Sequence, residues 1–216
     1  AGIRILARVL VNYHELYGFS LQITDIDPSY SLGDMERQRQ MTIAQLQKEG
    51  VWDMNREAPM PVVVQRVAVV SSANAAGYQD FRKELAKSPY RFEVTLFDAF
   101  MQGAAAEESI VTALCAVAER MDEFDAVVLI RGGGSASDLN CFNAYRLCAH
   151  VAQFPLPILT GIGHDKDTSV ADMVAHTALK TPTAVAGWLV ERMTQTEGWL
   201  DYAALQLHDA TKAAMH

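Results

Sequence analysis

His164 and two nearby carboxylates form the strongest candidate for acid–base chemistry in this sequence. They lie in the segment Gly161-Ile162-Gly163-His164-Asp165-Lys166-Asp167, directly after an apolar run that predicts a buried strand. An imidazole titrates near neutral pH, so His164 could take a proton from water or give one to a leaving oxygen. Asp167 could orient the imidazole or share the role of base. A metal site made of His164, Asp165 and Asp167, or a solvated polar loop, are the alternative interpretations.

The segment Arg131-Gly132-Gly133-Gly134-Ser135 is a candidate phosphate-binding loop. Glycines let backbone N–H groups approach an anion closely, and a helix that follows them favours negative charge at its N-terminus. Arg131 adds a permanent cation that can bind two phosphate oxygens at once. The spacing matches neither a P-loop nor a dinucleotide-binding fingerprint. We predict that this loop contacts a phosphorylated substrate; a flexible turn with a surface arginine is the alternative.

Four more residues are candidates by their positions. Asp80 lies early in a predicted helix and would face the same cleft, although compensation of the helix dipole is the simpler role for it. Ser72, in a serine-rich turn, is a predicted substrate contact. Thr181 and Thr183 bracket a proline at the start of a long predicted helix, where they could touch a phosphate or cap the helix.

Alternating strands and helices position these residues. Apolar or alternating runs predict strands at residues 65–70, 92–97, 126–130 and 157–160. Helices are predicted up to about Lys87, from Ala104 to Met121, and up to Val151, the last opened by a capping box of Ser135 and Asp138. Ser169 and Asp172 could cap another short helix. This order predicts a wound α/β fold with a mainly parallel sheet, in which ligands bind beyond the carboxyl ends of the strands.

Different patterns flank this region. Residues 3–11 and 17–25 predict an antiparallel hairpin, residues 32–49 a helix, and residues 55–61 a linker. After Thr183 the sequence is helical to its end, and a seven-residue apolar repeat there fits either a coiled coil or a plain amphipathic helix. The sequence starts without Met and its last helix has no cap, so we expect a fragment of a longer protein.

The composition narrows the class of protein. No apolar run reaches the roughly 18 residues that cross a bilayer, and no signal peptide is recognisable, so we expect a soluble, cytoplasmic protein. Cys115, Cys141 and Cys148 are odd in number and lie in apolar helical stretches, which predicts reduced core residues. A net charge of −8 argues against a general nucleic-acid coat protein but allows an enzyme that holds a few phosphates in one cleft.

Several stretches together resemble the large subunit of exonuclease VII. They include the Arg131–Ser135 loop, Gly163-His164 with Asp167, and, in the same order as in that family, the stretches Arg66–Ser72, Tyr78–Phe81, Val170–Asp172 and Lys180–Ala184. Upstream, Tyr17–Pro28 resembles the end of the family's N-terminal OB-fold. The family's loop more often reads Gly-His-Glu-Thr-Asp, so we assign no catalytic role to Asp165 or Lys166.

The resemblance implies a nuclease that cuts single-stranded DNA from either end into short oligonucleotides, in partnership with copies of a small helical subunit bound through further C-terminal helices. Position by position, it implies the catalytic residues Asp80, Arg131, His164 and Asp167. It implies no required cofactor; a divalent metal such as Mg²⁺ and homo-oligomerisation are left open.

The predicted organisation is a partial OB-fold hairpin (residues 1–28), a linker helix and loop (29–61), an α/β catalytic domain (62–183) and the start of a long helix (184–216). The predicted function is hydrolysis of phosphodiester bonds in single-stranded DNA. A non-catalytic module that binds a phosphorylated ligand and a metal-dependent phosphohydrolase are the alternatives.

Overall fold

Five parallel strands form the central sheet of the protein. The computed structural model describes residues 6–15, 17–133, 136–163 and 168–214. The sheet order is β4-β3-β5-β6-β7, with β3 at Arg66–Ser71, β4 at Glu93–Asp98, β5 at Ala126–Ile130, β6 at Ile158–Gly161 and β7 at Thr177–Ala178. The predicted wound α/β fold is therefore confirmed, although the two-residue β7 was not predicted because so short a strand leaves no periodic signal.

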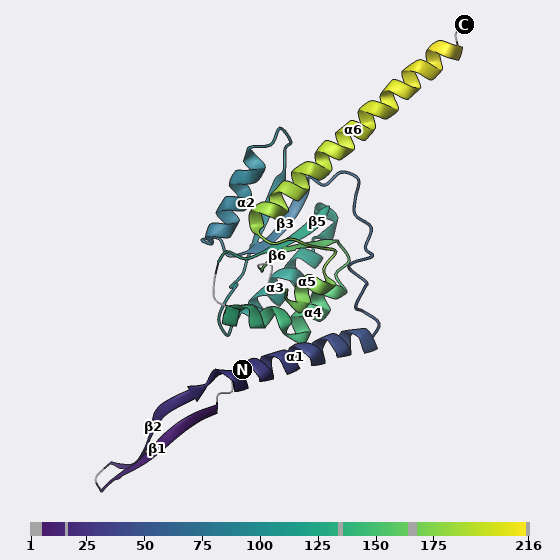
Figure 1. Cartoon of the computed structure of the whole chain (residues 1–216). Coiled ribbons are helices and arrows are strands. Elements are labelled where there is room, and N and C mark those ends of the chain that lie inside the picture. The colour runs from purple at the N-terminus through teal and green to yellow at the C-terminus, as the bar shows by residue number, and fades with distance from the viewer. Residues whose placement is uncertain (1–5, 16, 134–135, 164–167, 215–216) are drawn as a thin grey trace.

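Helices cover both faces of this sheet (Figure 1). Helices α2 (Ala76–Ala86) and α6 (Pro182–Ala214) pack on one face, against side chains such as Val69 and Val128. Helices α3 (Ala106–Ala118), α4 (Tyr145–Ala152) and α5 (Val170–Val174) cover the other face, and a short 3-10 helix, η1 (Met121–Glu123), follows α3. Every residue of β5 is buried, as expected for a strand covered on both sides.

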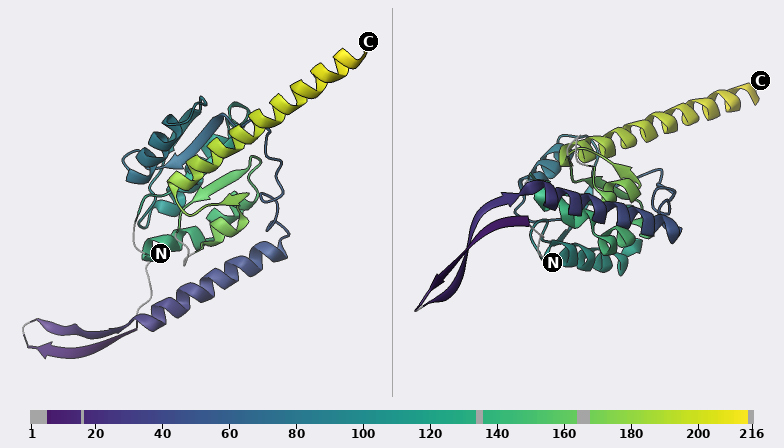
Figure 2. Two further views of the ribbon diagram at one scale, coloured as in Figure 1. Left: turned by 45° about the horizontal axis from the view of Figure 1, so that its top comes forward. Right: turned by 60° about the horizontal axis from the view of Figure 1, so that its bottom comes forward.

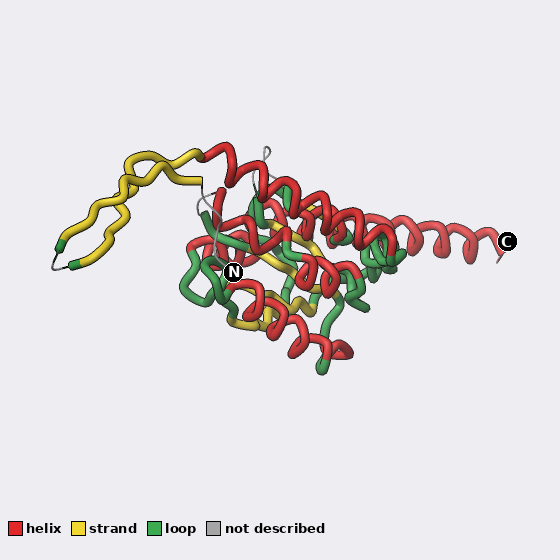
Figure 3. Tube along the Cα trace, turned by 90° about the horizontal axis from the view of Figure 1, so that it is seen from below, coloured by secondary structure: helices red, strands yellow, loops and turns green. Residues whose placement is uncertain are grey.

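The N-terminal hairpin and the end of α6 extend in opposite directions from this body (Figures 1 and 3). The hairpin consists of the antiparallel strands β1 (Leu6–His14) and β2 (Gly18–Asp27), as predicted. Its apolar side chains are largely exposed, for example Phe19 and Leu21. Helix α1 (Pro28–Lys48) then runs along the side of the body that carries α4 and α5 (Figure 2).

One predicted helix is broken into two elements. In place of a single helix reaching Val151, the chain forms a 3-10 helix, η2 (Ala136–Asn143), and then α4, which starts after the extended residue Ala144. Tertiary contacts explain the break: Phe142 is fully buried in the core, and the carbonyl of Asn143 accepts a hydrogen bond from the Thr42 hydroxyl of α1 (2.9 Å). Burial and hydrogen bonding at this point outweigh local helix propensity.

The prediction of three core cysteines is only partly correct. Cys148 is fully buried and Cys141 half-buried, but Cys115 is exposed on the outer face of α3. Thr112 and Glu119 are exposed beside it, at the i−3 and i+4 positions that share one side of a helix. The prediction for Cys115 is wrong because α3 is apolar over so much of its circumference that its buried side could not be identified from the pattern alone.

Candidate active site

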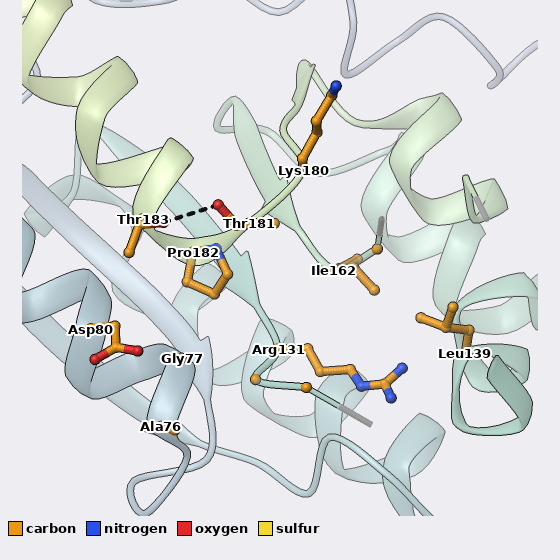
Figure 4. Close-up of a pocket in the computed structure, with 14 residues that line it drawn as sticks. Ala76, Gly77, Asp80, Arg131, Leu139, Ile162, Lys180, Thr181, Pro182 and Thr183 are labelled. Atoms are coloured by element: carbon orange, nitrogen blue, oxygen red, sulfur yellow. Dashed lines mark hydrogen bonds between the residues drawn. The ribbon is translucent and has the colours of Figure 1, made fainter. Parts of the chain in front are cut away.

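A pocket of about 330 Å³ opens at the carboxyl ends of β3, β5 and β6. Strands β3 and β5 are neighbours in the sheet, but the chain runs from them in opposite directions: from β3 to β4 on one side and from β5 to β6 on the other. Such a switch point is where open α/β sheets bind ligands. The pocket is lined by Ala76, Gly77, Asp80, Arg131, Gly132, Gly133, Leu139, Gly161, Ile162, Gly163, Lys180, Thr181, Pro182 and Thr183 (Figure 4).

Arg131 is the buried cation of this pocket. It follows β5 directly, its backbone N–H donates to the carbonyl of Gly161 (3.2 Å), and the residue is only 5% exposed. Its guanidinium group extends toward Leu139 and Ile162 in Figure 4. A positive group so shielded from water attracts an anion much more strongly than a surface arginine does.

Two glycines allow the loop after β5 to touch the start of α2. A Cβ atom added to Gly77 would lie 2.8 Å from the Cα of Gly132 and 2.9 Å from Cγ of Pro182. A Cβ atom on Gly132 would in turn lie 3.2 Å from the backbone nitrogen of Gly77. Gly132 therefore has a packing function that the sequence did not indicate: it brings the Arg131 loop against the N-terminus of a helix.

Gly161 plays the same part at the start of α6. A Cβ atom there would lie 2.8 Å from Cγ2 of Val185 and 3.0 Å from the carbonyl oxygen of Thr181. The chain can thus place the first turn of α6 directly over the end of β6. As a result, the N-termini of α2 and α6 both border the pocket, and both contribute partial positive charge to it.

Thr181 caps the N-terminus of α6. Its hydroxyl accepts a hydrogen bond from the backbone N–H of Ala184 (3.1 Å) and lies 3.0 Å from the hydroxyl of Thr183. Thr181 was predicted either to touch a phosphate or to cap the helix, and in the structure it caps the helix. Thr183 is exposed at the pocket rim, where its hydroxyl can reach a ligand.

Asp80 lies in the second turn of α2 at the edge of the pocket. Its side chain is 55% exposed, and one carboxylate oxygen is 3.7 Å from Nζ of Lys83, an i,i+3 pair on the helix surface. In Figure 4 the side chain of Arg131 extends in the direction away from Asp80. Asp80 is therefore better placed to contact a substrate, or a group on another loop, than to pair with Arg131.

The remaining predicted residues divide into three groups. Gly132 and Gly133 line the pocket, whereas the half-buried Ser72 does not. Gly134, Ser135, His164 and Asp167 lie outside the described residues, so their catalytic and substrate-binding roles stay predictions. Asp165 and Lys166, to which no catalytic role is assigned, lie outside them as well. Within residues 6–15, 17–133, 136–163 and 168–214, no three His, Cys, Asp or Glu side chains are grouped to hold a metal ion.

Eight lining residues are not among the predicted site residues: Ala76, Gly77, Leu139, Gly161, Ile162, Gly163, Lys180 and Pro182. Leu139 and Ile162 are apolar, and nothing in their local pattern separates them from core residues. Pro182 could have been found, because proline at the first helical position between two threonines marks a helix start that faces the carboxyl edge of the sheet.

Comparison with known proteins identifies the family of this chain. Residues 51–216 match the model of the family described as exonuclease VII, large subunit. The chain belongs to this family. It is 36% identical over 208 residues to the exodeoxyribonuclease 7 large subunit of Deinococcus radiodurans, covering 94% of this chain and 50% of that protein.

Other relatives carry the same name. The exodeoxyribonuclease 7 large subunit of Lactobacillus helveticus is 33% identical over 181 residues (82% of this chain and 40% of that protein). That of Cyanothece sp. is 39% identical over 141 residues (65% of this chain and 33% of that protein). The chain thus spans half or less of the length of these relatives. None of the helices in the described part of the chain has the length and apolarity of a membrane span.

Proposed function

We propose that this chain carries the active site of an exodeoxyribonuclease that hydrolyses phosphodiester bonds of single-stranded DNA into short oligonucleotides. The observation that carries the proposal is the pocket at the β3/β5 switch point, where buried Arg131 and the N-termini of α2 and α6 converge. Three sources of positive potential around about 330 Å³ suit a phosphate group in a chain whose net charge is −8. Membership of the exonuclease VII large-subunit family supports the same reading.

The proposed reaction is an attack of water on the phosphorus atom, with cleavage of one P–O ester bond. Arg131 and the backbone N–H groups of Gly132 and Gly133 neutralise the charge that develops on the non-bridging oxygens. His164 follows Gly163, which lines the pocket, and takes the proton of the water or gives one to the leaving oxygen. Asp167 orients the imidazole, and Asp80 contributes a second carboxylate at the pocket edge.

Binding of the DNA strand outside the pocket is assigned to other parts of the full-length protein and to its small subunit. The acidic charge of this chain predicts weak affinity for DNA on its own, since phosphate contacts dominate such binding. We propose that small subunits bind through helices continuing from α6. A cytoplasmic location stays a prediction, as does activity without a required metal.

Replacement of His164 by Ala in the full-length protein with its small subunit tests the proposal. The variant should release acid-soluble nucleotides from single-stranded DNA at least about 100-fold more slowly, while its DNA affinity is retained. His150→Ala is the matched control. His150 lies near the end of α4, which leads to the amino end of β6, whereas the pocket opens at the carboxyl ends of the strands. Near-normal hydrolysis by the His164 variant would refute the assignment. Complete loss of wild-type activity in a chelator, restored by a divalent ion, would instead favour a metal-dependent mechanism.

A further inference from the structure

Asp172 of α5 is a buried carboxylate whose two oxygen atoms bind different parts of the chain. Oδ1 accepts a hydrogen bond from the hydroxyl of Thr160 at 2.6 Å. Oδ2 accepts from both the hydroxyl (2.7 Å) and the backbone N–H (3.1 Å) of Ser169. Thr160, Ser169 and Asp172 are 0%, 2% and 6% exposed, so all three bonds are shielded from water.

These partners stand at the two ends of one segment. Thr160 belongs to the end of β6 and precedes Gly161, while Ser169 is the N-cap of α5. The chain between them contains Gly163, which lines the pocket, and the predicted acid–base residues His164 and Asp167. One side chain therefore fixes the distance between the start and the end of the segment that carries the proposed proton-transfer groups.

Neighbouring elements hold the end of this segment as well. The backbone N–H of Val170 donates to the side-chain oxygen of Asn143 (2.9 Å), and the carbonyl of Thr168 accepts from Arg39 of α1 (3.3 Å). Residues 168–170 are thus anchored by three side chains from α1, η2 and α5. The hydrogen bond between Asp172 and Thr160 then connects this anchored end of the segment to its other end, at β6.

The capping box of α5 accounts for only half of this arrangement. Ser169 and Asp172 exchange hydrogen bonds in the reciprocal pattern that starts many helices. That pattern needs no contact with β6, and α5 has only five residues. The short bond from Thr160 is additional, and it uses the carboxylate oxygen that the capping box leaves available.

We propose that Asp172 is a positioning residue of the active site: by binding both Thr160 and Ser169, it fixes the two ends of the chain segment that contains the predicted residues His164 and Asp167. The inference rests on the proposed function, because it matters for catalysis only if His164 and Asp167 transfer protons. Misplacement of a catalytic group by about 1 Å can cost on the order of 100-fold in rate, whereas remote DNA contacts are unaffected.

The decisive test separates the Thr160 bond from the capping box. In the full-length protein with its small subunit, Thr160→Val removes the donor to Asp172 and retains the shape of the side chain, while Thr160→Ser keeps a hydroxyl. We expect Thr160→Val to lower kcat on a single-stranded oligonucleotide about 10- to 100-fold with KM changed less than about threefold. Thr160→Ser should restore most of kcat, and Asp172→Ala should lower kcat at least as much as Thr160→Val.

A stability control distinguishes positioning from general loosening of the fold. Val64→Ala removes apolar contacts from the core between the sheet and helices α2 and α6, away from Asp172. Its unfolding midpoint should fall while kcat stays near wild type. The proposal is overturned if Thr160→Val keeps wild-type kcat, or if kcat follows the unfolding midpoint equally in Thr160→Val and Val64→Ala. An inactive His164→Ala together with a fully active Thr160→Val would refute this inference alone, whereas an active His164→Ala would refute the proposed function.

Discussion

Gly77→Ala tests the close approach on which the shape of the pocket depends. The added methyl carbon would lie 2.8 Å from Cα and 2.9 Å from N of Gly132, and 2.9 Å from Cγ of Pro182. Two of these atoms are backbone and the third is in a ring, so none can rotate away. Overpacking of this kind costs about 1–3 kcal/mol, because the surrounding structure must shift.

The control is Gly187→Ala, in which the methyl group of a helical alanine would meet open space on α6. Alanine is favoured over glycine within a helix by about 0.8–1 kcal/mol, so Gly187→Ala should raise stability. The gain at Gly77 is no larger than this, because Gly77 is the second residue of α2 and lies outside the helix interior. Gly77→Ala should therefore be less stable than Gly187→Ala by at least the cost of the contact, about 1–3 kcal/mol.

Thermal unfolding of the two variants, followed by far-UV circular dichroism, measures this difference. For a chain of 216 residues, about 1 kcal/mol corresponds to roughly 2–4 °C in Tm. A Tm of Gly77→Ala equal to or above that of Gly187→Ala would refute the claim that α2 and the Arg131 loop are in contact through these glycines.

Two further predictions concern groups outside the pocket. Burial alone would raise the pKa of Asp125, but hydrogen bonds from the Arg66 side chain and from the backbone N–H groups of Arg66 and Gln65 hold that pKa below its ordinary value. This stabilisation is present above the unfolded-state pKa and is lost as the pH falls through the folded-state pKa. Asp125→Asn should therefore lower the free energy of unfolding, measured with urea, by about 1.5–3 kcal/mol at pH 7 and by less at pH 3. An equal loss at both pH values would contradict this prediction. Among the three cysteines, Cys115 should react first with iodoacetamide at pH 8, as followed by mass spectrometry, because its thiol is exposed. Burial raises the pKa of Cys141 to about 11 and that of Cys148 further still, so these two thiols should react more slowly. Labelling of Cys148 as fast as Cys115 in the native protein would contradict this order.

Four of the five strands of the parallel sheet, β3 to β6, could be predicted because each is a largely apolar run followed by a turn. Residues 126–130 are a clear case, since five consecutive apolar residues predict a strand buried on both faces. The capping box of Ser169 and Asp172 was also predicted and is confirmed, because its two partners are three residues apart.

Features that depend on distant parts of the chain could not be predicted in the same way. The contact of Gly77 with Gly132 and the bond of Thr160 to Asp172 join segments whose proximity follows only from the strand order. The break between η2 and α4 likewise depends on Thr42 of α1, about one hundred residues away. In each case a tertiary contact decides the local structure, so the local pattern carries no signal for it.

Hydrolysis of single-stranded DNA by an Arg131→Gln variant tests the central claim most directly. The variant would be made in the full-length protein with its small subunit, and Arg56→Gln is the control. Arg56 forms a surface ion pair with Asp53, and its neighbour Asn55 binds the amino end of β6. If the pocket is the active site, Arg131→Gln should lower kcat on the order of 100-fold or more at an unchanged unfolding midpoint, while Arg56→Gln stays near wild type. Release of acid-soluble nucleotides by Arg131→Gln at the rate of the Arg56→Gln control would contradict the account.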